Sequence, residues 1–519
     1  MKLFTLTVLL CILHQKIDSA NILAICLMPN YSHFNTIHKL VTALVDRNHQ
    51  VTFINSRLDN TSTINYTNIF VEDVIEFISE INKNLADLAS AGPIRNAIHE
   101  FYLGLELTEI ALKSQPIQKL LNSKESFDAV VLELFYNEAV IGFANHFNAS
   151  AILVSPLGSS FRSNYLFANP APASYVPHKL SRFTKSMNFW QRLENFLLTK
   201  IIELLREIIF TPKQAQLLKK YINPEYNLEV VLNNISLLLS NSHVSVHSAV
   251  PHVPSTVNIG SYLINNSGKL PQDLQTYLDA STDGVILFSL GSNLESKSLA
   301  PKERDAILNA FTKIKQNVIW KFEADLSNIP KNVKILKWLP QQDLLAHANT
   351  KAFITHGGAA SLFEAVYFGV PIIGIPVFGD QNHNIVNAVN DGYAIGIPLM
   401  DLKEEKLLWA IQEIVTNPKY RDNVQQRSRI MRDQPSTPVD SGIYWIEHVI
   451  RHKGAPHLRS TSLDLKWYHR EMIDIITILV TIVTVFLIIF FLLLKKMFTK
   501  CDNISKKIKN CIVINKKNN

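Results

Sequence analysis

Residues 338–381 carry the stretch that decides the fold, WLPQQDLLAHANTKAFITHGGAASLFEAVYFGVPIIGIPVFGDQ. Its apolar run KAFIT predicts a buried strand, the segment after Gly358 predicts a helix, and PIIGIPV predicts a second strand. A strand, a helix and a strand in this order are typical of a βαβ unit in a parallel sheet. The sequence therefore predicts an α/β fold in this half of the chain.

The turn between the first strand and the helix suits a phosphorylated ligand. Gly357 and Gly358 let a ligand approach the main chain, and the start of the helix offers free N–H groups at the positive end of its dipole. His356 adds a side-chain donor beside them. These groups favour a diphosphate, whereas a Gly-Gly pair alone would fit a simple tight turn equally well.

Side chains around this turn supply the other parts of a nucleotide-sugar site. Glu364 can accept from both hydroxyls of a ribose, with a solvated helix carboxylate as the alternative. Trp338 offers a ring face to a base, and the Gln341 amide can reach the polar edge of that base. Asp380 and Gln381, at the end of the second strand, suit sugar hydroxyls.

The rest of the body repeats the alternation of strands and helices. NILAIC starts one series at residue 21, and VILFSLG starts a second at residue 285. We place an N-terminal domain at residues 21–270, a C-terminal domain at 271–440, and a return helix with a juxtamembrane segment at 441–474. Two facing α/β domains put a ligand cleft at their junction, outside the carboxyl ends of both sheets.

Two helical regions extend this picture. Residues 160–235 are rich in aromatic residues, and we expect Phe189, Trp190 and Phe196 to help cover an apolar acceptor cleft, with an ordinary core position as the alternative for each. The helical patterns at 424–432 and 441–452 are both expected to cross back onto the first domain.

Hydropathy indicates a membrane anchor, and the distribution of charge gives no support for nucleic-acid binding. Residues 1–20 have the layout of a signal peptide, and the uncharged run 475–494 suits one transmembrane helix. The tail, residues 495–519, holds eight lysines and one aspartate, and this difference of +7 equals the formal net charge of the chain. The body is therefore nearly neutral, and the basic tail predicts a type I topology with a lumenal body.

Smaller features fit that compartment. Lys516 and Lys517 resemble a dilysine retrieval signal of the endoplasmic reticulum, with a merely basic tail as the alternative. Cys26 is the one cysteine of the predicted lumenal body, so no intramolecular disulfide is expected there. The sequon at Asn30 lies in a site turn and is expected to stay unmodified, whereas others fit a lumenal glycoprotein: Asn60, Asn65, Asn148, Asn234 and Asn265.

Together, the motifs W-x-P-Q, THGG, GVP and F-x-DQ resemble the signature of the UDP-glycosyltransferases, and nearly the whole mature chain is similar to membrane-bound members of insects and other invertebrates. The resemblance implies a GT-B architecture of two facing Rossmann-like domains plus one C-terminal transmembrane helix. It implies a UDP-sugar as co-substrate, with no separate cofactor and no metal. By the same resemblance uracil is held by Trp338 and Gln341, ribose by Glu364, the diphosphate by His356, Gly358 and Ser292, and the transferred sugar by Asp380 and Gln381.

The resemblance also assigns a catalytic base. His33, in the motif P-x-x-S-H, matches the family's general base, and Glu133 occupies the place of the aspartate that orients this base in vertebrate relatives. His33 is expected at the start of a helix, whose positive end should keep the ring neutral and able to accept a proton. Because glutamate is one methylene longer than aspartate, the geometry of this pair is not given by the sequence.

The sequence thus predicts transfer of a hexose, with glucose preferred, to a hydroxyl of a small lipophilic acceptor with inversion at the anomeric carbon, for detoxification or metabolite conjugation. UDP-glucuronate is the main alternative donor. A sugar-nucleotide epimerase and a catalytically silent binder of UDP-sugars or lipophiles are the alternatives from other classes. The acceptor's identity and self-association into a homo-oligomer stay open.

Overall fold

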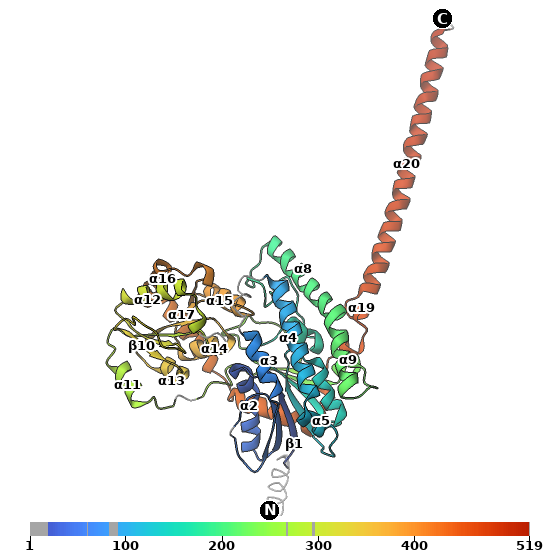
Figure 1. Cartoon of the computed structure of the whole chain (residues 1–519). Coiled ribbons are helices and arrows are strands. Elements are labelled where there is room, and N and C mark those ends of the chain that lie inside the picture. Colours follow the sequence, from blue (N-terminus) through green and yellow to red (C-terminus); the bar gives the residue numbers. More distant parts are fainter. Residues whose placement is uncertain (1–18, 60, 83–91, 266–267, 293–295, 518–519) are drawn as a thin grey trace, which may run out of the picture. The chain divides into compact units, whose positions relative to one another are not determined.

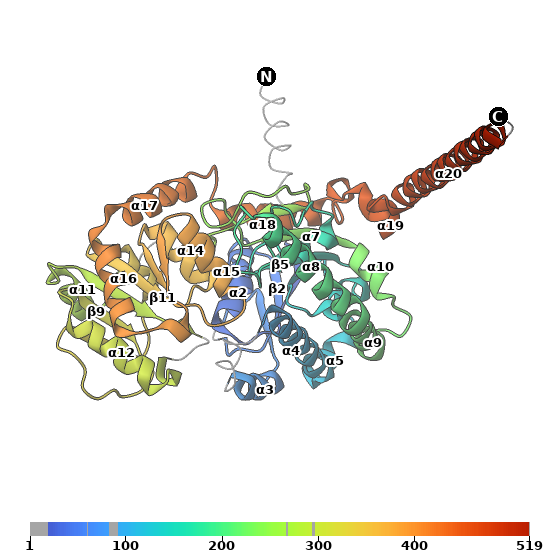
Figure 2. The same cartoon turned by 90° about the horizontal axis from the view of Figure 1, so that it is seen from above.

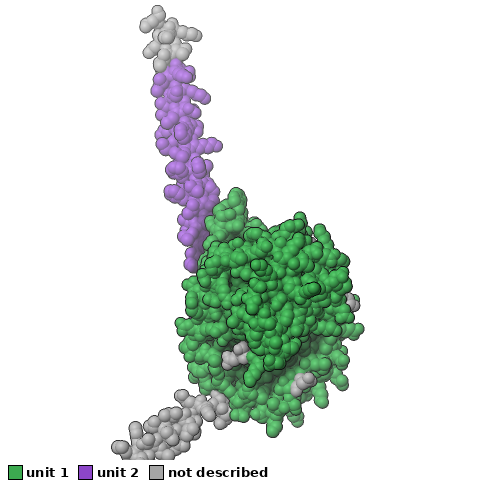
Figure 3. Space-filling view, turned by 90° about the vertical axis from the view of Figure 1, so that its left-hand side faces the viewer, with its two compact units in different colours: residues 1–460 green, residues 461–519 purple. Residues whose placement is uncertain are grey.

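The computed structural model describes residues 19–59, 61–82, 92–265, 268–292 and 296–517. It divides into two compact units, residues 1–460 and residues 461–519 (Figure 3). Almost all of the predicted signal peptide and the sequon at Asn60 lie outside the described residues.

Seven parallel strands form the first sheet, in the order β3-β2-β1-β4-β5-β6-β7. Figure 1 labels its strand β1. The inner strand β1 sends alternate side chains to opposite faces, with Ile22 in one apolar core and Leu23 in the other. Both faces are therefore covered, as a parallel sheet requires. The strands are β1 (Asn21–Cys26), β2 (Gln50–Asn55), β3 (Tyr66–Phe70), β4 (Ala129–Glu133), β5 (Ser150–Ser155), β6 (Ile235–Ser240) and β7 (Thr256–Asn258).

Helices cover both faces of this sheet (Figure 2). Helix α2 (Tyr31–Asp46) buries an apolar stripe against one face, and His33 lies in its first turn, as predicted. On the other face α5 and α9 contribute to the core. The helices after α2 are α3 (Asp73–Asn82), α4 (Pro93–Lys113), α5 (Gln115–Leu121), 3-10 η2 (Glu138–Ile141), α6 (Gly142–His146), α7 (Phe161–Phe167), α8 (Phe189–Leu205), π-helix η3 (Arg206–Phe210), α9 (Thr211–Tyr221) and α10 (Leu228–Asn233).

Six parallel strands form the second sheet, in the order β10-β9-β8-β11-β12-β13. Two parallel sheets within one compact unit confirm the prediction of a two-part α/β fold. The strands are β8 (Val285–Ser289), β9 (Asn317–Lys321), β10 (Val333–Leu336), β11 (Thr350–Thr355), β12 (Ile372–Gly374) and β13 (Ala394–Gly396). The helices are α11 (Gln272–Asp279), 3-10 η4 (Ser296–Ser298), α12 (Pro301–Thr312), α13 (Gln341–Ala346), α14 (Ala359–Phe368), α15 (Gln381–Asn390), 3-10 η5 (Leu399–Asp401), α16 (Glu404–Thr416) and α17 (Pro418–Arg432).

The two late helices differ in where they pack. Helix α18 (Pro438–Arg451) inserts Ile443, Ile446 and Val449 into the core beside β1, so the predicted return to the first sheet is confirmed. For α17 the prediction is wrong, because its Val424 and Met431 pack with α14 in the core of the second sheet. The crossing therefore takes place after α17.

The second unit is short and helical. The 3-10 helix η6 (Pro456–Leu458) still belongs to the first unit, and the second unit holds the 3-10 helix η7 (Thr461–Asp464), α19 (Trp467–Arg470) and α20 (Ile473–Lys517). Residues Ile473–Asn510 are long and apolar enough to cross a membrane. The predicted span 475–494 lies inside this helix, which continues through most of the predicted tail.

Candidate active site

A cleft of about 620 Å³ is lined by residues of both sheets' loops and helices. Met28 and His33 come from the first half, and the turns after β8, β11 and β12 come from the second. The structure brings nine predicted site residues to this cleft: His33, Ser292, Trp338, Gln341, His356, Gly358, Glu364, Asp380 and Gln381. The tenth, Glu133, lies behind His33.

His33 and Glu133 are hydrogen-bonded to each other. His33 lies in the first turn of α2, and its Nδ1 contacts Oε1 of Glu133, the last residue of β4. The carboxylate is fully buried, and its Oε2 accepts from the Cys26 thiol at 3.3 Å. The Nδ1–Oε1 contact leaves Nε2 as the ring nitrogen that can take a proton from a ligand in the cleft.

The protonation of His33 differs from the expectation. Burial lowers the pKa of His33, but the charge and hydrogen bond of Glu133, together with the charges of Asp380 and Glu100, outweigh it and raise the pKa above 6.5. The expected effect of the positive helix end is therefore overridden, because a carboxylate in direct contact acts more strongly than a helix dipole. A raised pKa makes His33 a stronger base.

The turn after β11 is built around the ring of His356. Gly291 has a φ of +88°, and a Cβ there would lie 2.5 Å from Cε1 of His356. A Cβ at Gly358 would lie 2.5 Å from Nε2 of the same ring. Both positions therefore need glycine so that the imidazole can sit between the two turns, next to the N-terminus of α14.

His356 is held neutral. Burial, with the positive charge of Lys321 in addition, lowers the pKa of His356 to about 4. The Lys321 Nζ donates to the carbonyl oxygen of Gly291 at 3.0 Å and to Oε1 of Glu323 at 2.6 Å. A neutral imidazole beside an ammonium and a helix N-terminus gives donors to an anionic ligand.

Glu364, on α14, accepts hydrogen bonds from two side-chain amides. Nε2 of Gln341 donates to Oε2 at 2.5 Å, and Nε2 of Gln342 donates to Oε1 at 2.9 Å. Burial raises the pKa of Glu364, while these hydrogen bonds lower it by less. Gln342 also accepts from the backbone N–H of Asn265 at 2.9 Å and so joins the first half to the second. The predicted role of Gln341 at a uracil stays a prediction.

Trp338 presents an exposed ring at the mouth of the cleft. Trp338 is 56% exposed, although Tyr31 and Lys321 both lie close to its ring. The Tyr31 ring of α2 meets it at 83° with centroids 5.3 Å apart, and Lys321 Nζ lies 5.8 Å from its centroid. The open surface can stack on a planar base.

Asp380 and Gln381 stand at the start of α15. Asp380 is partly buried, and this desolvation raises its pKa against the opposing charge of Lys179 and a hydrogen bond from Asn384. The Oε1 atom of Gln381 accepts from the backbone N–H groups of Val377 at 2.8 Å and Phe378 at 3.1 Å. Because Oε1 of Gln381 is used to hold this turn, only its amide NH₂ group is left to bind a sugar hydroxyl.

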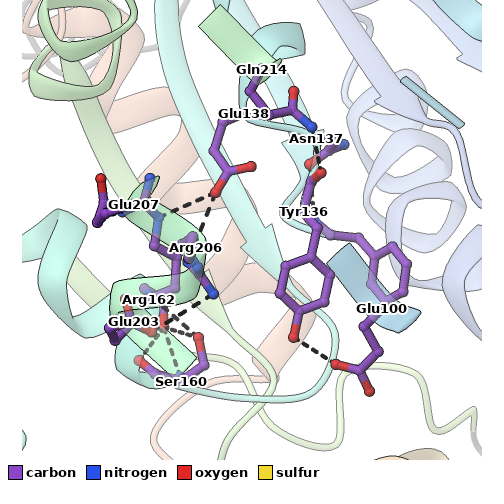
Figure 4. A network of polar contacts seen from close by, with 12 residues as sticks. Glu100, Tyr136, Asn137, Glu138, Ser160, Arg162, Glu203, Arg206, Glu207 and Gln214 are labelled. Atoms are coloured by element: carbon purple, nitrogen blue, oxygen red, sulfur yellow. Dashed lines mark hydrogen bonds and ion pairs between the residues drawn. The ribbon is translucent and has the colours of Figure 1, made fainter. Parts of the chain in front are cut away.

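A polar network borders the cleft on the side of the first sheet (Figure 4). Tyr136 donates its hydroxyl proton to Oε2 of Glu100 at 2.7 Å. Burial raises the pKa of Glu100 to about 7. Beside this pair Arg162 donates to Glu138 at 3.2 Å, and Arg206 lies 3.9 Å from the same carboxylate. Glu100 and Asp380 line both the cleft and this network's small cavity of about 80 Å³.

Comparison with known proteins identifies this arrangement. The model of the family described as "UDP-glucoronosyl and UDP-glucosyl transferase" matches residues 21–508. The chain belongs to this family. It is therefore a glycosyltransferase, as the sequence predicted, and a UDP-sugar donor and an acceptor are the substrates expected for the family.

Curated relatives match over most of this glycosyltransferase. UDP-glycosyltransferase UGT4 of Dactylopius coccus is 34% identical, covering 92% of this chain and 95% of its own. UDP-glucosyltransferase 2 of the same species is 31% identical over 91% and 92%. UDP-glucuronosyltransferase 2B17 of Mus musculus is 30% identical over 92% and 94%. Relatives named for glucose and for glucuronate therefore match this chain almost equally well.

Solved structures support the fold. The spinosyn forosaminyltransferase SpnP aligns with a TM-score of 0.58 at 15% identity, covering 84% of this chain and all of its own. At that identity the likeness shows the fold alone, and it confirms the predicted GT-B architecture. The apolar helix of the second unit, with the match to mammalian relatives, indicates a membrane-anchored glycosyltransferase.

Four cleft residues of this glycosyltransferase were missed from its sequence: Tyr31, Glu100, Lys321 and Gln342. Lys321 carried a usable signal, because it is a lysine at the carboxyl end of a parallel strand. Glu100 carried none, since it lies within a long helix, α4, whose placement depends on tertiary packing. Among the described residues, no group of three or more His, Cys, Asp or Glu side chains is arranged to hold a metal ion.

Proposed function

We propose that this glycosyltransferase moves glucose from UDP-glucose to a hydroxyl of a small lipophilic acceptor, with inversion at the anomeric carbon. The observation that carries the proposal is the buried His33–Glu133 pair at a cleft whose other wall holds Trp338, His356 and Glu364. A base and a nucleotide-sugar site on opposite walls of one cleft suit direct transfer.

The proton path begins at the acceptor. Nε2 of neutral His33 takes the hydroxyl proton as the acceptor oxygen attacks the anomeric carbon, while Nδ1 donates to Glu133. The new C–O bond forms as the bond from the anomeric carbon to the phosphate oxygen breaks, and UDP leaves with the electron pair. A single displacement of this kind inverts the anomeric centre. Buried Glu133 stabilises the imidazolium that forms.

The leaving diphosphate gains negative charge. The N-terminus of α14, the neutral His356 and the nearby Lys321 ammonium supply donors and positive potential for that charge. In this proposal Ser292 and Gly358 complete the diphosphate site, Glu364 binds the ribose, and Trp338 stacks on the uracil.

The charges around the sugar turn favour a neutral hexose. Glu100 and Asp380 both line the cleft, and Oε1 of Glu100 lies 3.7 Å from where a Cβ of Gly379 would stand. Lys179 is a cation electrostatically coupled to both, but its Nζ already donates to the carbonyl oxygens of Leu157 and Gly158. A glucuronate carboxylate would add a further negative group beside Asp380 and Glu100, and Glu100, with a pKa raised to about 7, is itself negative above neutral pH. UDP-glucose is therefore the proposed donor.

The acceptor side of the cleft has an apolar part among polar side chains. Met28, Ile78 and Leu103 contribute, with Phe135 beside the base at a ring-centroid distance of 5.0 Å from His33. Apolar side chains near the base suit the apolar part of a lipophilic alcohol or phenol. We propose conjugation or detoxification as the role, carried out by a lumenal body anchored in the endoplasmic reticulum membrane.

The test uses membranes that contain the full chain. Supplied with UDP-glucose and a panel of phenols, they should yield β-glucosides if the donor is the α-linked sugar nucleotide, as read by mass and by the anomeric proton coupling. Glucuronides as the sole products would contradict the donor, and retention of configuration would contradict the mechanism. Binding of UDP without any transfer would contradict the enzymatic proposal.

A further inference from the structure

Helix α8 does not cover the acceptor side of the cleft as the sequence predicted. Phe189, Trp190 and Phe196 were expected at the acceptor cleft or in the core, but they are 61%, 72% and 47% exposed. That expectation is wrong for all three, because none lines the cleft. This helical region instead turns a charged residue inward, Arg206, which is the first residue of η3 and only 5% exposed.

The buried guanidinium of Arg206 has two donors, Nε and Nη1, without a hydrogen-bond partner among the described residues. Its ion pairs are long: Nη1 lies 3.9 Å from Oε1 of Glu138, and Nη2 lies 3.8 Å from Oε1 of Glu203 (Figure 4). The rings of Phe101 and Tyr136 lie close to it, with centroids 5.1 Å and 5.5 Å from Cζ. A buried charged donor without an acceptor carries the full cost of its desolvation, so a ligand oxygen at this edge would be favoured.

A change in helix type holds Arg206 in this position. Residues 189–221 are continuously helical, and the α-helical pattern gives way to a π-helix at Arg206–Phe210. Pro212, in the first turn of α9, has no N–H to donate to the preceding turn, which accounts for the change just before it. The ring of Phe210 is buried 4.7 Å from that of Phe101, so the segment is anchored in an apolar cluster. π-Helical turns are frequent at functional sites.

Arg206 lines the cavity of about 80 Å³ that borders the cleft. One water needs about 10–15 Å³, so this volume takes a group of a few heavy atoms. Phe135, whose ring centroid lies 5.0 Å from that of His33, separates the base from the cavity. Five residues line both the cavity and the cleft: Glu100, Phe135, Pro156, Leu157 and Asp380. The cavity therefore adjoins the acceptor side of the cleft.

The charges around the cavity favour a neutral ligand group. A carboxylate would add to the acidic side chains already present, and an ammonium would offer no acceptor to the donors of Arg206. A carbonyl or hydroxyl oxygen accepts hydrogen bonds without adding charge. Three basic side chains line the cavity with four acidic ones, of which the last has a pKa raised to about 7 by burial: Arg162, Lys179, Arg206, Glu138, Glu203, Asp380 and Glu100.

We propose that the cavity beside Arg206 binds a neutral oxygen at the end of the acceptor that lies away from the reacting hydroxyl. The proposal rests on the proposed function, because an acceptor hydroxyl at His33 puts the rest of that molecule beside Phe135 and Leu157. Those two apolar side chains line both spaces and suit an apolar linker between two oxygen groups. The acceptor class is thereby narrowed to hydroxy compounds with a second, uncharged oxygen, such as hydroxyphenyl ketones.

The first test measures binding to the full chain in lipid nanodiscs, saturated with UDP so that no transfer takes place. The probes are 4-hydroxyphenyl alkyl ketones with linkers of increasing length, each paired with the alkylphenol of the same length that lacks the carbonyl. Calorimetric titration should show a linker length at which the ketone binds about tenfold more tightly than its alkylphenol. Equal binding at every length would leave the cavity to water and overturn the proposal.

Two arginine variants assign the preference to a side chain. Arg206→Lys keeps the positive charge beside Glu138 but loses the planar fork of N–H donors, so the ketone preference should disappear. Arg162→Lys is the matched control, because Arg162 lines the same cavity and is also 5% exposed. Its Nε and Nη1 already donate to Glu138 at 3.2 Å and to Glu207 at 3.0 Å, so the preference should persist there. Equal loss in both variants would show that packing of the network sets the preference, and would also overturn the proposal.

UDP binding checks the fold of each variant, and if Arg206→Lys fails this check the series on the unaltered chain still decides. Sugar transfer is measured separately. A ketone preference without transfer to any probe would contradict the proposed function and support the oxygen site, whereas transfer without a ketone preference would do the reverse.

Discussion

Nδ1 of His33 on α2 is hydrogen-bonded to Oε1 of Glu133 on β4, a residue 100 positions further along the chain. Strands β1 and β4 are neighbours in the first sheet, and α2 follows β1, so the sheet order itself brings the two side chains together. Glu133 is wholly buried, while His33 also faces the cleft. The buried Glu133 carboxylate therefore acts on the His33 ring, which a ligand in the cleft can reach.

His33→Ala should reduce kcat by about 10²–10⁴-fold, the usual contribution of a positioned general base. UDP binding should be unchanged, because the donor-binding side chains lie on the other wall. Steady-state kinetics and calorimetric titration with UDP measure the two effects. His38→Ala is the matched control, since His38 lies on the same helix and pairs with Asp59 at 3.4 Å, outside the cleft lining. Equal losses in both variants would contradict the assignment.

Glu133→Gln should move the acid limb of the pH profile to lower pH. The base acts as neutral imidazole, so kcat/KM falls as pH drops through the pKa of His33, which Glu133 raises. Without the Glu133 carboxylate, burial lowers the pKa of His33, so the acid limb of the kcat/KM profile moves to lower pH. The plateau rate also falls, because the imidazolium that forms has lost the charge that stabilises it. Profiles from about pH 5 to about pH 9 measure this shift. An unmoved limb would show that another group titrates.

Trp338→Ala should weaken UDP binding by about 1–3 kcal/mol, the usual value for stacking of one base on an aromatic ring. The ring is 56% exposed, so its removal leaves no core cavity and the fold should persist. Calorimetric titration with UDP checks the loss. Trp409→Ala on α16 is the control, since that ring is 53% exposed and lies outside the cleft lining. Unchanged UDP affinity would remove Trp338 from the base site.

Glu100→Gln should relax discrimination against UDP-glucuronate. The substitution keeps an acceptor for the Tyr136 hydroxyl, which donates to Glu100 at 2.7 Å, but removes the negative charge beside the Gly379 turn. At about pH 8, where Glu100 with its pKa of about 7 is mostly ionised, the ratio of kcat/KM for UDP-glucose to that for UDP-glucuronate should fall by about tenfold, which corresponds to about 1.4 kcal/mol. An unchanged ratio, with UDP-glucose transfer intact, would place the sugar's C6 group elsewhere.

His247→Gln should flatten the loss of stability in acid. Burial lowers the pKa of His247 from 6.5 to about 3, with Lys179, His383 and His243 adding to it. As pH falls below 6.5 the unfolded chain binds a proton that the folded chain refuses, so stability is lost until pH nears 3. The slope from this group approaches about 1.4 kcal/mol per pH unit. Unfolding of the full chain across this range, compared with the variant, measures it.

The sequence predicted which residues of the second half meet at the cleft. Short apolar runs ending in glycine turns fix both the strands and the turns between them, so His356, Gly358 and Asp380 fall at the carboxyl ends of parallel strands and at the same edge of one sheet. Local pattern was sufficient because each of these residues lies within a few positions of its strand. The contact of Gln342 with Glu364 was not predicted, because the sequence does not show which of the two adjacent glutamines faces the cleft.

The sequence was less informative about the helices. It could not tell that the apolar positions of α8 lie outward, because periodicity gives the faces of a helix and not which one is covered. It also placed the end of α17 on the wrong sheet, since its apolar spacing fits either core. The sequence also misjudged the direction of the pKa shift of His33. The helix end that would lower this pKa is visible in the sequence, whereas Glu133, which raises it, lies 100 residues away and has no local signal.

By itself the sequence predicted two parallel sheets, a helix long and apolar enough to cross a membrane, and the position along the chain of each residue proposed for the donor site, because these depend on apolar runs and turn residues that act over a few positions. Only the tertiary structure decided which groups meet: Glu133 behind His33, Glu100 beside Gly379, and Gln342 between Glu364 and Asn265. Such contacts depend on packing between distant segments, and the free energy that selects them is spread over the whole core.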